Sequence, residues 1–231
     1  MSVRTVDFAG NTSAEASTAY WKVRPRIIDS WQVGTNHPLP PAGTDRALYF
    51  ALTYNINSTT DLTGLTYGGQ AMVQIADLTS GVADNNNVRL EVWRCTEACI
   101  AGAADGNFVQ TWSAGAPGGN RSYSHVVVEG VDQATMVNDV DQSVSTAAST
   151  RTLNINEAAF SISLSSCVHA NPGGISWNDI TWLHGVNQGS NGHVNRSASR
   201  TPAAAGVATV TPSHQNTNDM GCIGVNLNPS P

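Results

Sequence analysis

Charged side chains are scarce in this chain of 231 residues, where Asp, Glu, Lys and Arg together make up 12% against a usual share of about 25%. Lys22 is the only lysine, and no basic cluster is longer than the segment Lys22–Arg26. With a formal net charge of -6, the chain lacks the basic surface that holds a phosphate backbone. We therefore expect no nucleic acid among its partners.

Long apolar segments are missing as well. No apolar run approaches the roughly 18 residues that a membrane-spanning helix needs. The first residues, Met1–Asp7, lack the apolar stretch of a secretory signal peptide. We therefore expect no membrane partner, and we expect synthesis in a cytoplasm.

Sequence signatures of catalysis are absent, including His-Glu-x-x-His, Gly-x-Ser-x-Gly, the phosphate-binding loop and the His-x-His pair of cupins. A glycosidase on a β-sandwich would need two carboxylates in one cleft. The closest pairs are Glu91 with Glu97, near the end of an expected strand, and Glu129 with Asp132, on either side of a turn. Solvated or loop-capping carboxylates explain both pairs, so we expect no catalytic residues and no enzyme.

Metal ligands are also few. His184 and His193 bracket a loop across which they could approach one another, but the sequence indicates no third ligand. The segment Asp84–Asn87 and the loop around Asp61 carry the oxygen ligands that calcium accepts. The same residues are ordinary turn formers. We expect no cofactor, with calcium as the alternative at these two loops.

Four cysteines leave three interpretations open: free buried thiols, one or two disulfides, or a metal site. Cys95 and Cys99 flank three residues and could close a small loop. Cys167 and Cys222 each fall on the face of an expected strand opposite its apolar row, so a cross-strand pair is geometrically conceivable. Neither a Cys-x-x-Cys pair nor a finger-like histidine spacing occurs, which disfavours zinc.

What the chain does have is a period-two alternation of apolar and polar residues. Leu48, Phe50, Leu52 and Tyr54 fall on one face of a strand expected at 46–54. Similar patterns predict strands at 88–95 and 160–168. Weaker strand signals lie at 3–8, 22–28, 65–76, 108–113, 122–129, 151–156, 179–186, 205–211 and 220–227.

Helical signal is confined to the short segments 14–19 and 98–104, and turn-forming Gly, Asn and Pro residues separate the expected strands. The pattern predicts one all-β domain over residues 21–231, an antiparallel β-sandwich or jelly roll. Residues 1–20 are expected to form an N-terminal arm or an edge strand.

Three segments in order, Asp45–Leu52, Leu65–Met72 and Val88–Arg94, carry a strand, the run Thr-Tyr-Gly-Gly-Gln and a strand ending in Val-Trp. This order resembles jelly-roll domains of bacterial surface proteins and of tailed-phage virion proteins, including capsid decoration (cement) proteins. The resemblance covers residues 45–130, with Leu90 in place of the family's valine. It implies a fold and no catalytic residues. Within it, Gly68-Gly69 would permit a tight bend and Gln70 would cap open backbone groups, while Met72 returns to the core.

The resemblance, the lack of a signal peptide and the lack of a catalytic site lead us to expect a virion structural protein. The predicted role is a capsid decoration protein, synthesised in a host cytoplasm, that binds the major capsid protein on the capsid surface as a homotrimer. The expected contacts lie in the N-terminal arm and a proline-rich loop: Tyr20, Trp21, His37, Pro38, Pro40 and Pro41.

A carbohydrate-binding or adhesive module of a phage tail or bacterial surface is the alternative. It would use some of the six tryptophans as an exposed row of rings that stack on a glycan. Trp93 is expected on the strand face opposite Leu90 and Val92. Core or subunit-contact roles for most of the tryptophans are the competing interpretation.

Overall fold

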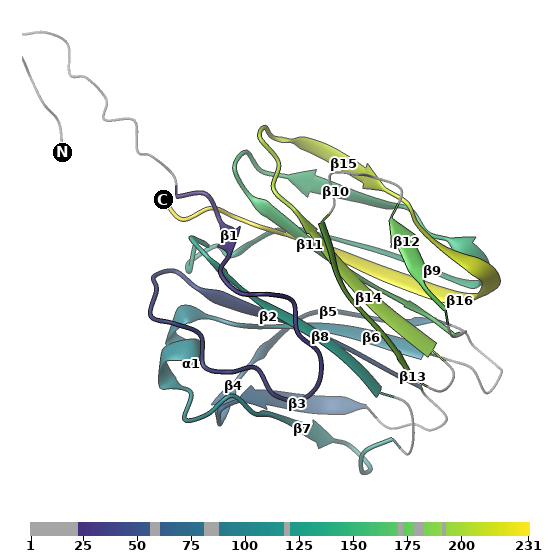
Figure 1. Cartoon of the computed structure of the whole chain (residues 1–231), viewed down its shortest axis with the longest axis horizontal. Coiled ribbons are helices and arrows are strands. Elements are labelled where there is room, and N and C mark those ends of the chain that lie inside the picture. The colour runs from purple at the N-terminus through teal and green to yellow at the C-terminus, as the bar shows by residue number, and fades with distance from the viewer. Residues whose placement is uncertain are drawn as a thin grey trace, which may run out of the picture.

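The computed structural model describes residues 23–55, 61–80, 88–117, 121–170, 173–177, 183–190 and 193–231. Within these ranges the chain forms sixteen strands and one helix of six residues (Figure 1). Every pair of named strands is antiparallel. The prediction of an all-β antiparallel sandwich is confirmed. No helix among the described residues has the length and hydropathy to cross a membrane.

The first large sheet comes from the N-terminal half of the chain and has the strand order β1-β8-β2-β6-β5. Its strands are β1 (Arg26–Ile27), β2 (Ala47–Asn55), β5 (Val73–Ser80), β6 (Val88–Cys95) and β8 (Arg121–Glu129). The central strands of this sheet, β2, β6 and β8, are buried on both faces. Alternate residues of β2 therefore enter two different cores, with Tyr49 on one side and Phe50 on the other. A strand buried on both faces needs apolar residues at successive positions.

A small sheet and the helix cover one face of this first sheet. The small sheet has the order β4-β3-β7, from β3 (Leu62–Tyr67), β4 (Gln70–Ala71) and β7 (Phe108–Trp112). The helix α1 (Glu97–Gly102) begins after Thr96, whose hydroxyl accepts a hydrogen bond from the Cys99 amide. The side chains of β2 that face the small sheet pack in this core against Leu65, Tyr67, Ile100 and Phe108.

The second large sheet comes from the C-terminal half and has the order β12-β16-β11-β14-β13, with β9 also paired to β16. Its strands are β9 (Val137–Thr150), β11 (Ile162–His169), β12 (Ile175–Trp177), β13 (Leu183–Ser190), β14 (His193–Arg200) and β16 (Pro212–Leu227). Its outer face is covered by the pair β10 (Leu153–Glu157) and β15 (Gly206–Val210), through contacts of Leu153, Ile155 and Val210.

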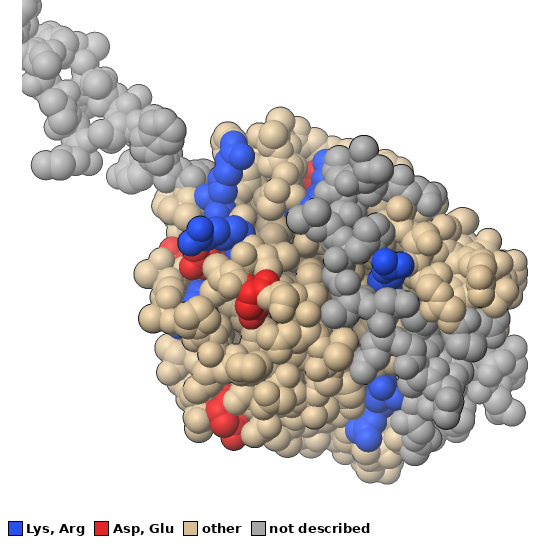
Figure 2. All heavy atoms as spheres, viewed as in Figure 1, with Lys and Arg blue, Asp and Glu red and all other residues tan. Residues whose placement is uncertain are grey.

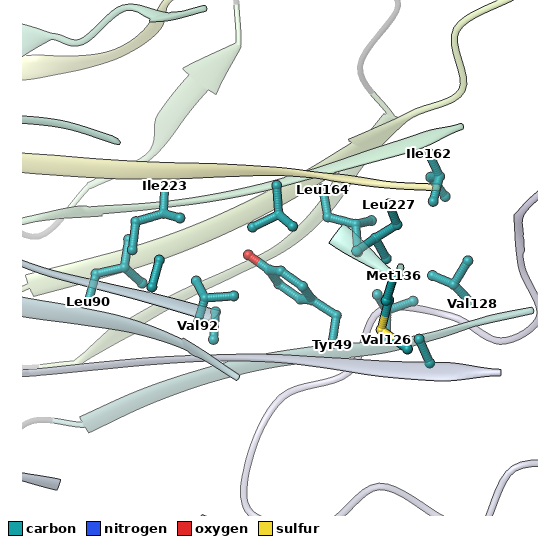
Figure 3. Close-up of a cluster of buried hydrophobic side chains, with 14 of the residues drawn as sticks. Tyr49, Leu90, Val92, Val126, Val128, Met136, Ile162, Leu164, Ile223 and Leu227 are labelled. Atoms are coloured by element: carbon teal, nitrogen blue, oxygen red, sulfur yellow. The ribbon is translucent and has the colours of Figure 1, made fainter. Parts of the chain in front are cut away.

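The central core lies between the two large sheets (Figure 3). Leu90, Val92 and Val126 face it from the first sheet, and Leu164 and Ile223 from the second. Because both halves of the chain supply this core, the described residues pack as one unit. Successive strands stay within one half of the chain and do not alternate between the two large sheets. The result is a stack of four β layers, visible from bottom to top in Figure 1.

A chain of hydroxyl groups runs through the central core. The Tyr49 hydroxyl lies 3.0 Å from that of Ser166, and Ser197 lies 2.6 Å from both Ser166 and Ser124. Tyr49 and Ser124 belong to the first sheet, and the other two serines to the second. All four residues are buried. Since a buried hydroxyl is costly unless it is hydrogen-bonded, these bonds favour one alignment of the two sheets.

Both cysteine pairs form disulfides, Cys95–Cys99 and Cys167–Cys222. Cys167 and Cys222 lie directly opposite one another on β11 and β16, with their Cα atoms 4.1 Å apart. Such close approach is typical of the non-hydrogen-bonded pairs of an antiparallel ladder. Each half of the chain therefore holds one disulfide. Of the three interpretations of the cysteines that the sequence leaves open, the structure selects two disulfides.

The Gly68-Gly69 bend is confirmed. Both residues have positive φ, +53° and +82°, which glycine adopts without strain. Gln70 donates a hydrogen bond from Nε2 to the carbonyl of Gly102 at the end of α1, and Met72 is buried. The turn thus ties the small sheet to the helix.

Three strands escaped prediction, β9, β12 and β14. The sequences of β9 and β14 are rich in Ser, Asn, Thr and Asp and lack a clear apolar row, and β12 has only three residues. The expected strand at 3–8 and the expected helix at 14–19 lie outside the described residues, as does the N-terminal arm. The helix expected at 98–104 is confirmed as α1.

Candidate functional site

The loop between β1 and β2 carries most of the residues predicted to contact a partner. Pro38 and Pro41 are exposed and Pro40 is half-buried, while the neighbouring Leu39 is 50% exposed. This segment therefore presents apolar surface to solvent. The other two predicted contacts, Tyr20 and Trp21, lie outside the described residues.

His37 is a correction to the predicted contact surface. Its imidazole is fully buried, with Nε2 at 2.5 Å from Oδ2 of Asp29 and Nδ1 at 2.8 Å from Nδ1 of His125. A side chain enclosed in this way does not reach a partner, so the prediction is wrong for His37. The residue anchors the loop to the sheet instead.

His125 supplies the sheet side of this anchor. It belongs to β8, and its ring stacks on Phe50 with centroids 5.9 Å apart and approaches Phe108 at 5.0 Å. Burial and, to a smaller extent, the neighbouring His37 lower the pKa of His125 to about 3, against the opposing effects of backbone hydrogen bonds and the Asp29 carboxylate. His125 is therefore neutral near pH 7, when the anchor is intact.

The base of the loop is fixed by Arg46, which is almost fully buried. Its Nη1 donates to the carbonyl of Pro41 at 2.7 Å, and its Nε and Nη2 donate to the Glu97 carboxylate at 2.9 and 2.5 Å. The hydrogen bond from Arg46 lowers the pKa of Glu97. Near the other end of the loop, the Tyr67 hydroxyl donates to the carbonyl of His37 at 3.0 Å. The exposed prolines therefore sit on a loop that is held at two points.

The carboxylates examined for catalysis have separate structural partners. Glu129 pairs with Arg26, and Asp132 accepts bonds from the backbone of its own turn, as expected of solvated or loop-capping acids. Glu97 pairs with Arg46. The expectation of a solvated residue is wrong for Glu91, which is fully buried.

Glu91 lies in the core between the first large sheet and the small sheet. It accepts hydrogen bonds from the Tyr54 hydroxyl at 2.6 Å, from Trp93 Nε1 at 3.0 Å and from Gln74 Nε2 at 3.2 Å. Desolvation raises its pKa, while these donors and the Arg89 guanidinium at 3.2 Å act in the opposite direction. A carboxylate so fully engaged by its own fold is a packing element.

Where the structure describes them, the metal candidates are not assembled into a site. The carboxylate of Asp61 pairs with Arg89, and the segment Asp84–Asn87 lies outside the described residues. The β13–β14 hairpin places His193 opposite Ser190 and His184 opposite Ala198, so the two histidines are not cross-strand neighbours. Among the described residues no group of three His, Cys, Asp or Glu side chains could hold a metal ion. Calcium at these loops stays a prediction.

The chain matches no protein-family model, no curated protein and no solved structure. The resemblance to jelly-roll virion and surface domains therefore depends on the sequence motif at residues 45–130 alone.

Little in the sequence indicates that Asp29, His37 and His125 form a cluster. The two histidines are 88 positions apart, and no motif links them. The one usable signal is that Ser122, Ser124 and His125 interrupt an otherwise apolar strand. Polar residues in a strand buried on both faces need partners, and such partners are found in the loop and in the facing sheet.

Proposed function

We propose that this chain is a non-enzymatic structural protein of a phage particle. In this role it is a capsid decoration (cement) protein that binds the major capsid protein on the capsid surface and bridges neighbouring capsomers. Its mechanism is stabilisation by many weak contacts, whose combined strength comes from multivalency. A homotrimer on a threefold position would satisfy closed symmetry.

The observation that supports this proposal is that the proline-rich loop lies beside β1, close to the point where the described residues begin. The chain enters the described region at Val23, which bridges to Ser230 near the C-terminus. Ser230 is bonded in turn to Gly130. Pro41 of the proline-rich loop lies beside Arg26 of β1, because both line the same cavity. An N-terminal arm and this loop would therefore meet a partner on one face.

The rigidity of the stack also suits a bridging role. Among the described residues, two disulfides and the anchored loop hold the backbone in place, which lowers the entropic cost of association for this part of the chain. Disulfides persist on virion and cell surfaces and are rare in reducing cytosol. In the proposed role they would close after the particle leaves the host cytoplasm.

The test is quantitative mass spectrometry of purified particles from the source, together with imaging of the same particles. A fixed ratio to the major capsid protein, with copies at every capsomer junction, is the expected result. A handful of copies would assign the protein to the tail and favour adhesion. Its absence from particles would refute the proposal.

The alternative, a glycan-binding module, gains less support from the described residues. Trp93 and Trp177 are buried, and Trp31 and Trp112 are half-buried. Phe160 is exposed at 37%, but the Arg24 guanidinium lies 4.6 Å from its ring centroid. A screen against polysaccharides would decide between the two roles if particles lacked the protein.

A further inference from the structure

Residues 28–37, called here the cover segment, lie along the edge of β8 that faces away from β2 (Figure 1). The amide of Ile28 donates to the carbonyl of Val127 at 3.1 Å. Gln32 and His125 exchange both of their backbone hydrogen bonds, at 2.9 and 3.0 Å. The cover segment therefore continues the pairing that β1 begins, and it closes this edge of the first large sheet.

The end of the cover segment pairs with the start of β7 in the small sheet. The Phe108 amide donates to the carbonyl of Thr35 at 2.9 Å, and the His37 amide donates to the carbonyl of Gly106 at 2.8 Å. Between this part and the part beside β8 lies Gly34, whose φ of +95° is one that glycine adopts without strain. The cover segment thus joins the edges of two different sheets.

Asp29, His37 and His125, called here the histidine cluster, tie the two parts of the cover segment together. His37 comes from the part beside β7, and its Nε2 lies 2.5 Å from Oδ2 of Asp29, in the part beside β8. Its Nδ1 lies 2.8 Å from Nδ1 of His125. The other oxygen of Asp29 accepts a hydrogen bond from the amide of Val127 in β8. Both rings are fully buried.

The contact between the two rings limits how many protons the cluster can hold. A hydrogen bond between the two Nδ1 atoms needs one ring to donate and the other to accept. An imidazolium carries hydrogen on both of its nitrogens and accepts no hydrogen bond. If His37 and His125 were both protonated, two donors would face one another at this distance. The contact is therefore compatible with at most one protonated ring.

Few other charged groups face the histidine cluster. From β2 and β7, the rings of Phe50 and Phe108 pack against His125. From β3, the Tyr67 hydroxyl donates to the His37 carbonyl, and burial raises the pKa of Tyr67 to about 12, so it stays neutral in mild acid. Three more titratable groups lie around Tyr67 and Phe50: Arg46, Asp105 and Tyr123. Most of the surface in this view is uncharged (Figure 2), so a second positive charge in the cluster would be poorly balanced.

We propose that the histidine cluster makes the cover segment sensitive to acid. When both rings are protonated, the cover segment separates from the edges of the two sheets while the other strands stay folded. The exposed prolines of the proline-rich loop follow directly after His37. Acid would therefore free this end of the loop and leave the end bonded to Arg46 in place. The inference goes beyond the proposed function and does not depend on which partner the loop contacts.

The expected magnitude follows from the linkage between opening and protonation. Burial and, to a smaller extent, His37 lower the pKa of His125 to about 3 while the segment is closed, and the opened ring returns to about 6.5. Above pH 6.5 neither form takes up a proton at His125, so opening does not depend on pH. Below it the opened form takes up a proton that the closed form does not. The equilibrium constant for opening should rise about 30-fold between pH 7.5 and pH 5.0.

The test is hydrogen–deuterium exchange of the full chain, followed by mass spectrometry, with rates corrected for the intrinsic pH dependence of amide exchange. The protection of residues 28–37 should fall about 30-fold between pH 7.5 and pH 5.0. Urea at about 1 M should not change this protection, because a local opening exposes little surface. Constant protection over this pH range would overturn the proposal. Protection that depends on urea and equals that of β16 would also overturn it, because exchange would then require global unfolding.

Two variants separate titration from packing. His125→Asn removes the titrating ring, and the pH dependence of protection should fall below about threefold. Phe108→Leu is the matched control, since it removes a ring that contacts His125 and leaves both histidines in place. It should lower protection at every pH and keep the dependence of about 30-fold. Full dependence in His125→Asn, or loss of dependence in both variants, would overturn the assignment to the histidine cluster.

The native chain alone also tests the assignment, should His125→Asn fail to fold. Its protection at residues 28–37 should begin to fall as the pH drops below about 6.5, the value of an opened histidine. A fall that begins only below about pH 4, where exposed carboxylates titrate, would overturn the proposal. Thermal unfolding of each variant checks that the fold is intact.

Discussion

The buried histidine pair predicts a specific loss of stability in mild acid. His125 has a pKa of about 3 in the folded protein and about 6.5 when unfolded. Below pH 6.5 the unfolded chain takes up a proton that the folded chain refuses, so the free energy of unfolding falls as the pH falls. At pH 7.5 the effect is negligible. At pH 5.0 the two pKa values give a loss of about 2 kcal/mol.

The assay is urea unfolding at several pH values from 7.5 to 5.0, for the native chain and for His125→Asn. Asparagine keeps a polar group near the position of Nδ1 but does not titrate. The variant loses ring packing against Phe50 and should be less stable at every pH. Its pH dependence, however, should be shallower by about 2 kcal/mol over this range. Parallel pH profiles for the two proteins would refute the burial of a neutral His125.

Five further variants test three other parts of the fold by chemical unfolding. Replacing both Cys167 and Cys222 by alanine should lower the free energy of unfolding by about 4 kcal/mol, because the disulfide closes a loop of 55 residues and so restricts the unfolded chain strongly. Removing the disulfide at α1, whose cysteines are 4 positions apart, should lower it by only about 2 kcal/mol. Equal losses would contradict the argument that the benefit grows with loop length. Gly68→Ala should lower the free energy of unfolding by about 3 kcal/mol. The added Cβ clashes with a backbone carbonyl, and alanine is also strained at this positive φ. Gly69→Ala, with open space around it, should cost about 1 kcal/mol, and the reverse order would refute the turn geometry. Ser197→Ala removes the shared partner of two buried hydroxyls and should cost about 2 kcal/mol, whereas a neutral effect would show that the hydroxyl chain does not align the sheets.

Strands that carry an apolar row could be predicted from the sequence, and strands stabilised by polar contacts could not. The alternation in β2 correctly placed Leu48 and Phe50 on one face. In β14, by contrast, Ser197 and Asn195 are buried and form hydrogen bonds with Ser124 of the facing sheet. A polar side chain is predicted to be exposed when its hydrogen-bond partner is far away in the sequence.

The same limit applies to the candidate site. The proline-rich loop was predicted from composition, and its exposed prolines are where the sequence placed them. His37 was assigned to the surface because nothing near it in the sequence reveals Asp29 and His125 as partners. Glu91 was misjudged for the same reason, since Tyr54 and Gln74 are supplied by neighbouring strands.

The division of the chain into two consecutive halves has a consequence for its biosynthesis. The N-terminal half can complete the core between the first large sheet and the small sheet by itself, because both sheets and α1 all lie before residue 130. The opposite face of that sheet, including Val92 and Val126, stays uncovered until the second sheet forms. That second sheet is organised around β16, the last of the described strands, which pairs with β9, β11 and β12. On the ribosome, a half-made molecule would therefore carry a broad apolar surface until its final strand emerges, and it would depend on chaperones during that interval.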